Sequence, residues 1–163
     1  MKSRRAYLLL GANLGDRART LRRAVAGLGA LEGCRRLRSS RLYETAPVGP
    51  SEKPYLNLAV VLETTRSAMG LLLEAKRLEA AAGRRPGVRW SARALDVDLV
   101  ALGTERVRTP WLSVPHPLMA RRPFALAPLA DLAWKPVGKR PASRLLAAMK
   151  PDPGIVKLWK DGR

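Results

Sequence analysis

The chain has 163 residues and a formal net charge of +18, from 31 Lys and Arg residues against 13 Asp and Glu residues. Hydrophobic residues make up 47% of it, which excludes a disordered basic tail, and its apolar runs are shorter than the roughly 20 residues of a membrane span. We therefore expect a single globular domain over residues 1–163 that binds anionic partners, such as nucleotide phosphates or nucleic acid.

The N-terminal residues and the cysteine content predict a cytoplasmic location. The apolar run that follows Arg5 reaches only Leu10 before Gly11, which is too short for the core of a signal peptide. Cys34 is the single cysteine, so the chain cannot form an internal disulfide, and we expect a structurally incidental thiol.

The first part of the chain predicts three strands and a helix. Residues 5–10, 37–43 and 56–64 are typical of strands, and a helix begins after Asp16, which is a suitable N-cap. The segment 44–54 contains three prolines and a glycine, so we expect a long, stiffened loop between the second and third strands.

The second part predicts a helix, a strand and an irregular tail. Ser67 caps a helix that runs to about Ala82, and the apolar residues around Asp96 and Asp98 predict a strand. Further along, residues 106–109 suit a short strand that returns as a hairpin partner. Residues 124–134 suit a short core segment, and residues 143–149 suit a final helix.

The order strand, helix, strand, strand, helix, strand is typical of a ferredoxin-like split βαβ arrangement. We therefore expect an α+β fold in which the helices pack on one side of an antiparallel sheet. Fold class alone says nothing about the chemistry.

Two carboxylates lie two residues apart in the strand predicted around residues 95–100. The period of two puts Asp96 and Asp98 on one face and Leu95, Val97 and Leu99 on the other. Carboxylates on the same side suit Mg²⁺, which binds such oxygens together with substrate phosphates. The alternative is a solvated face whose acids pair with the surplus arginines.

Arginines and the single histidine flank this strand. Several could clamp phosphates, or could form a generic basic surface: Arg84, Arg85, Arg89, Arg93, Arg121 and Arg122. His116, held between two prolines, either places an imidazole donor on a polyphosphate or is structural. Trp90 is either a core residue or a stacking platform. A phosphate-binding Gly-Lys-Ser/Thr loop, a zinc pattern and a serine elbow are absent from the sequence, so metal and arginines must hold any phosphates.

Five motifs follow one another along the chain. They are YLLLGANLGDR at 7–17, YETAPVG at 43–49, YLN at 55–57, RWSARALDVD at 89–98, and VPHPLM at 114–119 leading to Arg122 and Phe124. In this order they resemble the 6-hydroxymethyl-7,8-dihydropterin pyrophosphokinase family of folate biosynthesis. The resemblance runs from about Ala6 to Trp134. It implies transfer of pyrophosphate from ATP to the hydroxymethyl group of the pterin, with release of AMP.

The resemblance also implies residue roles. Asp96 and Asp98 would hold two Mg²⁺ ions that bridge the ATP phosphates, and Arg84 and Arg93 would be catalytic arginines. The residues implied near ATP are Glu79, Arg89, Trp90, Leu99, His116 and Arg122. The pterin would lie between the rings of Tyr55 and Phe124, and its polar edge would meet Asn57 and the backbone of Thr45, Ala46 and Val48.

Two other hypotheses remain at this stage. An RNA-binding domain would suit the basic charge and the split βαβ order, although acids occupy the strand where aromatic residues would be expected. A catalytically inactive relative is disfavoured by the presence of Asn57, Asp96, Asp98 and His116. We expect a monomeric enzyme that binds ATP and the pterin but neither nucleic acid nor a membrane.

Overall fold

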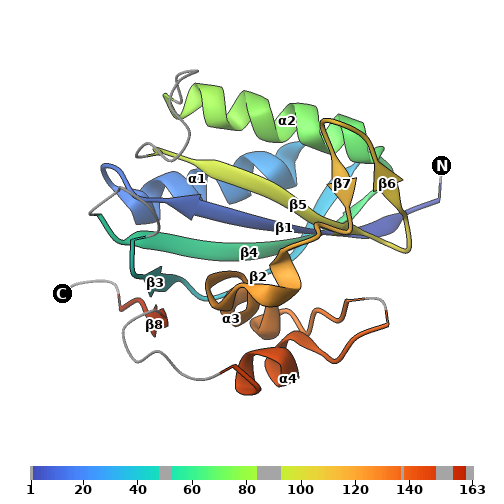
Figure 1. Cartoon of the computed structure of the whole chain (residues 1–163). Helices are drawn as coiled ribbons and strands as arrows, with labels where there is room; N and C mark the ends of the chain where they lie inside the picture. Colours follow the sequence, from blue (N-terminus) through green and yellow to red (C-terminus); the bar gives the residue numbers. More distant parts are fainter. Residues whose placement is uncertain (1, 48–52, 84–92, 137, 150–155, 161–163) are drawn as a thin grey trace.

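A computed structural model describes residues 2–47, 53–83, 93–136, 138–149 and 156–160 (Figure 1). Within these ranges the chain forms a six-stranded antiparallel sheet with the order β5-β1-β4-β3-β8, and β2 also pairs with β4. The strands are β1 (Arg4–Ala12), β2 (Cys34–Ser39), β3 (Tyr43–Thr45), β4 (Tyr55–Thr64), β5 (Asp96–Leu102) and β8 (Val156–Leu158). The predicted α+β fold is confirmed.

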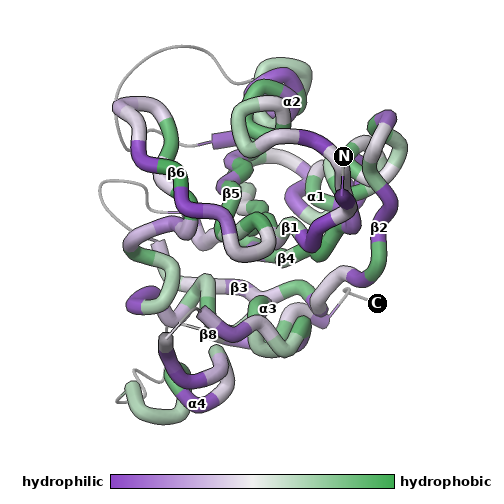
Figure 2. The backbone as a smooth tube through the Cα atoms, turned by 90° about the vertical axis from the view of Figure 1, so that its right-hand side faces the viewer, coloured by the Kyte–Doolittle hydropathy of each residue, from purple (hydrophilic) through white to green (hydrophobic). Residues whose placement is uncertain are grey.

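Helices lie on both faces of this sheet (Figures 1 and 2). One face is covered by α1 (Arg17–Ala30) and α2 (Ala68–Ala81), and the opposite face by the 3-10 turn η1 (Met119–Arg121), α3 (Pro123–Asp131) and α4 (Ala142–Ala147). The expectation that helices occupy one side only is therefore wrong for the C-terminal part. None of the helices in the described ranges is long and apolar enough to cross a membrane.

The apolar runs of β1 and β4 are explained by this two-sided cover. Leu8 and Leu10 pack with residues of α1 and α2, whereas Leu9 packs with residues of α3. A strand buried on both faces reads as a continuous hydrophobic run and not as an alternation. The core therefore lies on both faces of β1 and β4, and the neighbouring strand β5 contributes buried residues to it.

The two long helices begin where the sequence predicts. Asp16 accepts a hydrogen bond from the backbone N–H of Arg19 at 3.0 Å, and Ser67 accepts one from Gly70 at 3.1 Å. Each side chain satisfies a donor that the first helical turn leaves without an intrahelical partner.

Three strand predictions need correction. The predicted strand 37–43 is broken into β2 and β3, and at the break Ser40 bonds to Ala59 through both its backbone N–H and its hydroxyl. The predicted hairpin partner 106–109 becomes β6 (Val107–Arg108), which pairs with β7 (Ser113–Val114) and not with β5. The C-terminal strand β8 was not predicted.

A half-buried carboxylate links α3 to the start of β3. Asp131, the last residue of α3, accepts hydrogen bonds from the backbone and guanidinium of Arg41 and from the hydroxyl of Tyr43, at 2.8–3.1 Å. Burial favours a higher pKa for Asp131, but these hydrogen bonds outweigh it and lower the pKa below its ordinary value. The ionised carboxylate therefore stabilises the packing of α3 against the sheet.

We expect Asp131→Asn to lower the melting temperature by about 2–5 °C at pH 7. Because the pKa is lowered in the folded state, the stabilisation is present above the unfolded pKa near about 4 and is lost as the pH falls through the folded value. Thermal melts of both proteins at pH 7 and at about pH 3 test this, since the difference should shrink in acid. Glu63→Gln, which removes only the exposed pair with Arg35, is the control and should change little. A difference that does not change with pH would contradict the ionic role.

Candidate active site

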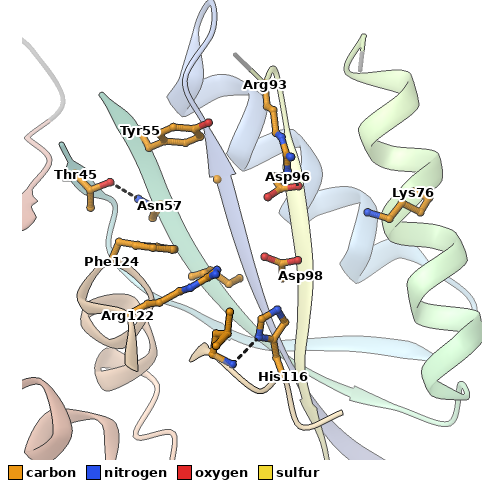
Figure 3. A pocket seen from close by; sticks show the side chains of 13 residues that line it. Thr45, Tyr55, Asn57, Lys76, Arg93, Asp96, Asp98, His116, Arg122 and Phe124 are labelled. Carbon is orange, nitrogen blue, oxygen red and sulfur yellow. Dashed lines mark hydrogen bonds and ion pairs between the residues drawn. The ribbon is translucent and has the colours of Figure 1, made fainter. Parts of the chain in front are cut away.

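A pocket of about 670 Å³ opens on the face of the sheet that carries α3 (Figure 3). Residues of four neighbouring strands, β5, β1, β4 and β3, form its floor, and the segment 116–124 and α2 supply its sides. The lining residues are Leu9, Gly11, Thr45, Tyr55, Asn57, Lys76, Arg93, Asp96, Asp98, His116, Leu118, Arg122 and Phe124.

The strand register aligns the polar groups of the floor. Gly11 pairs with Asp96 on one side and with Asn57 on the other, so one row crosses β5, β1 and β4. A Cβ atom at Gly11 would lie 3.1 Å from the Oδ1 atom of Asn57. Glycine at this position therefore keeps the floor open between a carboxylate and an amide. Asp98 pairs with Leu9, one row further along.

Asp96 and Asp98 both face the pocket, as the period of two predicts (Figure 3). Burial raises the pKa of Asp98 to about 6, and the neighbouring charge of Asp96 adds to this effect. The Nη1 atom of Arg93 donates to Asp96 at 2.8 Å. Arg93 offsets part of the charge of Asp96, and a cation bound beside the two carboxylates would favour the ionised form of Asp98.

Asn13 holds Arg93 in place. The backbone N–H of Arg93 donates to the Oδ1 atom of Asn13 at 2.7 Å, and the backbone N–H of Asn13 donates to the carbonyl of Arg93 at 3.1 Å. The loop that follows β1 thus positions the residue that contacts Asp96. This role of Asn13 is not visible in the sequence, because the two residues are 80 positions apart.

Glu79 lies behind the aspartate strand and not in the pocket. Its side chain is 2% exposed, and its carboxylate accepts from the backbone N–H of Val97 at 2.9 Å and from Lys76 at 3.0 Å. Lys76 itself lines the pocket. The sequence analysis missed Lys76, because one lysine among 31 basic residues carries no signal of its own.

His116 and Arg122 lie at the end of the pocket nearest Asp98 (Figure 3). The backbone N–H of His116 donates to Val100 of β5 at 2.8 Å, and its Nδ1 atom accepts from the backbone of Leu118 at 3.2 Å. Burial, together with the charge of Arg122, lowers the pKa of His116. The ring is therefore neutral at pH 7 and carries its proton on Nε2.

The opposite end of the pocket is aromatic and amide-lined. The rings of Tyr55 and Phe124 lie on either side of a gap, with Asn57 beside it (Figure 3). Asn57 is buried and donates from Nδ2 to the hydroxyl of Thr45 at 2.9 Å, which fixes the orientation of its amide. Pro123 begins α3, so Arg122 and Phe124 flank the helix start. A flat, polar heterocycle fits this slot.

Some predicted residues do not reach the pocket. Leu99 is 4% exposed and packs toward α1 and α2, because the alternation that presents Asp96 and Asp98 turns its side chain away. Ala46 is described but does not line the pocket. Four predicted site residues lie outside the described ranges, namely Val48, Arg84, Arg89 and Trp90.

The donor set suits a hard cation that also binds substrate. Within the described ranges, no three His, Cys, Asp or Glu side chains cluster closely enough to hold a metal ion. Two carboxylates alone suit Mg²⁺, which keeps several waters and takes its remaining ligands from phosphates.

Comparison with known proteins decides the family. The family model of 7,8-dihydro-6-hydroxymethylpterin-pyrophosphokinase matches residues 7–134. The chain belongs to this family. The family predicted from the sequence is confirmed, and pyrophosphokinase activity on a hydroxymethyldihydropterin is the activity for which the family is named.

Relatives named 2-amino-4-hydroxy-6-hydroxymethyldihydropteridine pyrophosphokinase support the assignment. The Bacillus subtilis protein is 38% identical over 95% of this chain and 90% of its own length. The protein from Methylorubrum extorquens is 40% identical over 79% of this chain and 82% of its own. A folate synthesis bifunctional protein from Pisum sativum is 34% identical over 94% of this chain but only 30% of its own length.

Solved structures agree on the fold. An HPPK-DHPS in complex with substrates matches 91% of this chain with a TM-score of 0.72 and 12% sequence identity. Plasmodium falciparum HPPK-DHPS matches 90% with a TM-score of 0.69 and 15% identity. This chain spans about two fifths of the length of those proteins, 43% and 45% respectively.

Proposed function

We propose that this chain is a single catalytic domain that transfers a pyrophosphoryl group from ATP to the hydroxymethyl oxygen of 6-hydroxymethyl-7,8-dihydropterin. The products are the pterin diphosphate and AMP. One observation carries the proposal: a single pocket joins a paired-carboxylate corner, at Asp96 and Asp98, to an aromatic slot between Tyr55 and Phe124. Family membership supports it independently.

Asp96 and Asp98 fit two Mg²⁺ ions bound together with ATP. Both carboxylates face the pocket, and the burial that raises the pKa of Asp98 is offset when a cation binds beside it. Bound Mg²⁺ neutralises charge on the phosphate oxygens and supports an in-line displacement. In this role Asp96 and Asp98 would be the residues that hold the ions.

Basic side chains bind the phosphates around this corner. His116 presents a neutral Nε2–H donor, and Arg122 and Lys76 present cations to the same pocket. Arg93 pairs with Asp96 through one nitrogen, and its guanidinium has further N–H donors for a phosphate oxygen. Arg84 remains a predicted catalytic arginine, and Arg89 and Trp90 remain predicted contacts of ATP; all three lie outside the described ranges.

The pterin ring stacks between Tyr55 and Phe124, and its polar edge meets Asn57. One amide hydrogen of Asn57 is committed to Thr45. The second hydrogen and the Oδ1 atom provide a donor and an acceptor side by side, which matches the amide-like edge of a pterin. Backbone groups of Thr45, Ala46 and Val48 complete this edge in the proposal.

In this proposal the two aspartates take different positions in the reaction. Asp96 shares a row with Asn57, so it lies on the pterin side, whereas Asp98 lies one row nearer His116. The pterin oxygen attacks the β-phosphorus, its bond to phosphorus forms, and the bond from that phosphorus to the α-phosphate oxygen breaks to release AMP. Asp96 is the carboxylate placed to accept the hydroxyl proton.

Pterin-dependent formation of AMP tests the proposal. The purified protein with ATP, Mg²⁺ and the hydroxymethyl pterin should form AMP, and omission of the pterin or addition of EDTA should abolish it. ATP consumption that is independent of the pterin would contradict the assignment, and so would the absence of ATP consumption with every substrate present.

The monomeric state, the cytoplasmic location and the absence of nucleic-acid binding stay predictions.

A further inference from the structure

The C-terminal strand β8 extends the sheet beyond the residues that the family model matches. It pairs with β3 on the edge opposite β4, with Val156 beside Thr45 and Leu158 beside Tyr43. Just after the strand, the backbone N–H of Trp159 donates to the carbonyl of Leu42 at 2.9 Å. The segment 156–159 is thereby attached to the strand that carries Thr45 into the pocket.

The side chain of Trp159 covers Arg17. The indole is half-buried and packs against the core on the α1 side of the sheet. The guanidinium carbon of Arg17 lies 5.0 Å from the centroid of the indole ring, which is within the range of a cation–π contact. The side chain of Arg17 is only 18% exposed, so the indole shields much of the guanidinium from water.

Arg17 in turn forms hydrogen bonds with a residue of β3 and with the residue just before β4. Its Nη2 atom donates to the carboxylate of Glu44 at 2.9 Å, and its Nη1 atom donates to the carbonyl of Pro54 at 2.8 Å. Each of these residues immediately precedes a residue that lines the pocket, Thr45 and Tyr55, and those two residues pair with each other in the register. The guanidinium of Arg17 therefore bonds to the residues that directly precede Thr45 and Tyr55 at the proposed pterin slot.

We propose that Trp159 and Arg17 form a positioning unit for pterin recognition, acting through Glu44 and Pro54. Adjacent residues of a strand point to opposite faces of the sheet. The hydrogen bond from Arg17 fixes Glu44 on the α1 face, and it thereby fixes the direction in which the next residue, Thr45, points into the pocket. Asp96, Asp98, His116 and Arg122 lie on elements other than β3 and the residue before β4. This inference rests on the proposed function, because it assigns the pterin to the slot beside Thr45 and Tyr55.

Steady-state kinetics of Trp159→Ala tests the unit. We expect the KM for the pterin to rise about tenfold, which corresponds to the loss of a partly buried cation–π contact, while the KM for ATP changes less than about twofold. Trp159→Phe keeps an aromatic face over Arg17 and should restore most of the pterin affinity. Lys160→Ala, which alters an exposed neighbour, is the matched control and should behave as the unaltered protein.

Three results would overturn the inference. They are an unchanged pterin KM in a folded Trp159→Ala protein, an equal rise in the KM for both substrates, and a Trp159→Phe protein as impaired as the alanine variant. If Trp159→Ala does not fold, Arg17→Lys provides the test, because lysine keeps the charge but cannot hold Glu44 and Pro54 with two fixed N–H groups. A pterin KM that does not rise in Arg17→Lys overturns the inference as well. Failure of the unaltered protein to form AMP would instead overturn the proposed function.

Discussion

Asp98→Asn lowers the rate of AMP formation by about three orders of magnitude or more, and the protein remains folded. The physical reason is the loss of a charged oxygen ligand at the corner where the phosphates are neutralised, which is worth several kcal/mol in the transition state. Asp96→Asn has a similar effect through the same corner. Quantifying AMP at saturating ATP, Mg²⁺ and pterin measures the change.

The same substitution should stabilise the metal-free protein. The pKa of Asp98 is about 6 in the folded protein and lower in the unfolded chain. Between these two pKa values the unfolded state binds fewer protons than the folded state. The free energy of unfolding therefore falls as the pH rises through this range. At pH 7.5 the ionised carboxylate therefore destabilises the fold by about 1–3 kcal/mol, and asparagine removes this charge. Urea unfolding in EDTA measures the gain.

The control for both measurements is Asp16→Asn. Asp16 is exposed and caps α1, and asparagine caps a helix about as well as aspartate does, so activity and stability should both stay near those of the unaltered protein. Near-normal AMP formation by either pocket variant would contradict the metal assignment. A less stable Asp98→Asn protein in EDTA would contradict the electrostatic account of the corner.

Asn57→Ala lowers kcat/KM for the pterin by about 100-fold, because each hydrogen bond to a buried polar group contributes about 1–3 kcal/mol and the substitution removes a donor and an acceptor together. It also removes the buried hydrogen bond to Thr45. The KM for ATP should stay within about twofold, since Asn57 is not among the groups that hold the phosphates.

Initial rates at varied pterin and at varied ATP separate these effects. Glu63→Gln, near the other end of the same strand and with a side chain 40% exposed, is the matched control and should show unaltered kinetics. A loss in Asn57→Ala that falls equally on both substrates would contradict the assignment of Asn57 to the pterin edge.

Local patterns in the sequence account for a large part of this fold. The helix caps at Asp16 and Ser67 satisfy donors within the first turn, so a few neighbouring residues suffice to predict where both helices begin. The period of two around Asp96 and Asp98 places both carboxylates on one face whatever surrounds the strand. The five motifs together identified the family before any contact was known.

Other features depend on contacts between distant segments. The segment after β7 is attached to β5 by the hydrogen bond from the backbone N–H of His116 to Val100, and α3 follows this segment on the same face of the sheet. No local pattern in the sequence predicts that face. The break between β2 and β3 is stabilised by the pairing of Ser40 with Ala59. Likewise, a buried hydrogen bond from Val97 of β5 holds Glu79 of α2 behind the aspartates, whereas Lys76 of the same helix lines the pocket.

The sequence by itself determined which groups this protein offers: the spacing predicts the paired carboxylates and the basic groups beside them, and the family resemblance predicts the aromatic pair and the amide. Only the tertiary structure decided how these groups meet. The row from Asp96 through Gly11 to Asn57, and the contacts of Arg17 with Trp159, Glu44 and Pro54, join residues that are far apart along the chain. The physical reason is that periodicity acts between neighbours, whereas register and packing arise only when the strands pair.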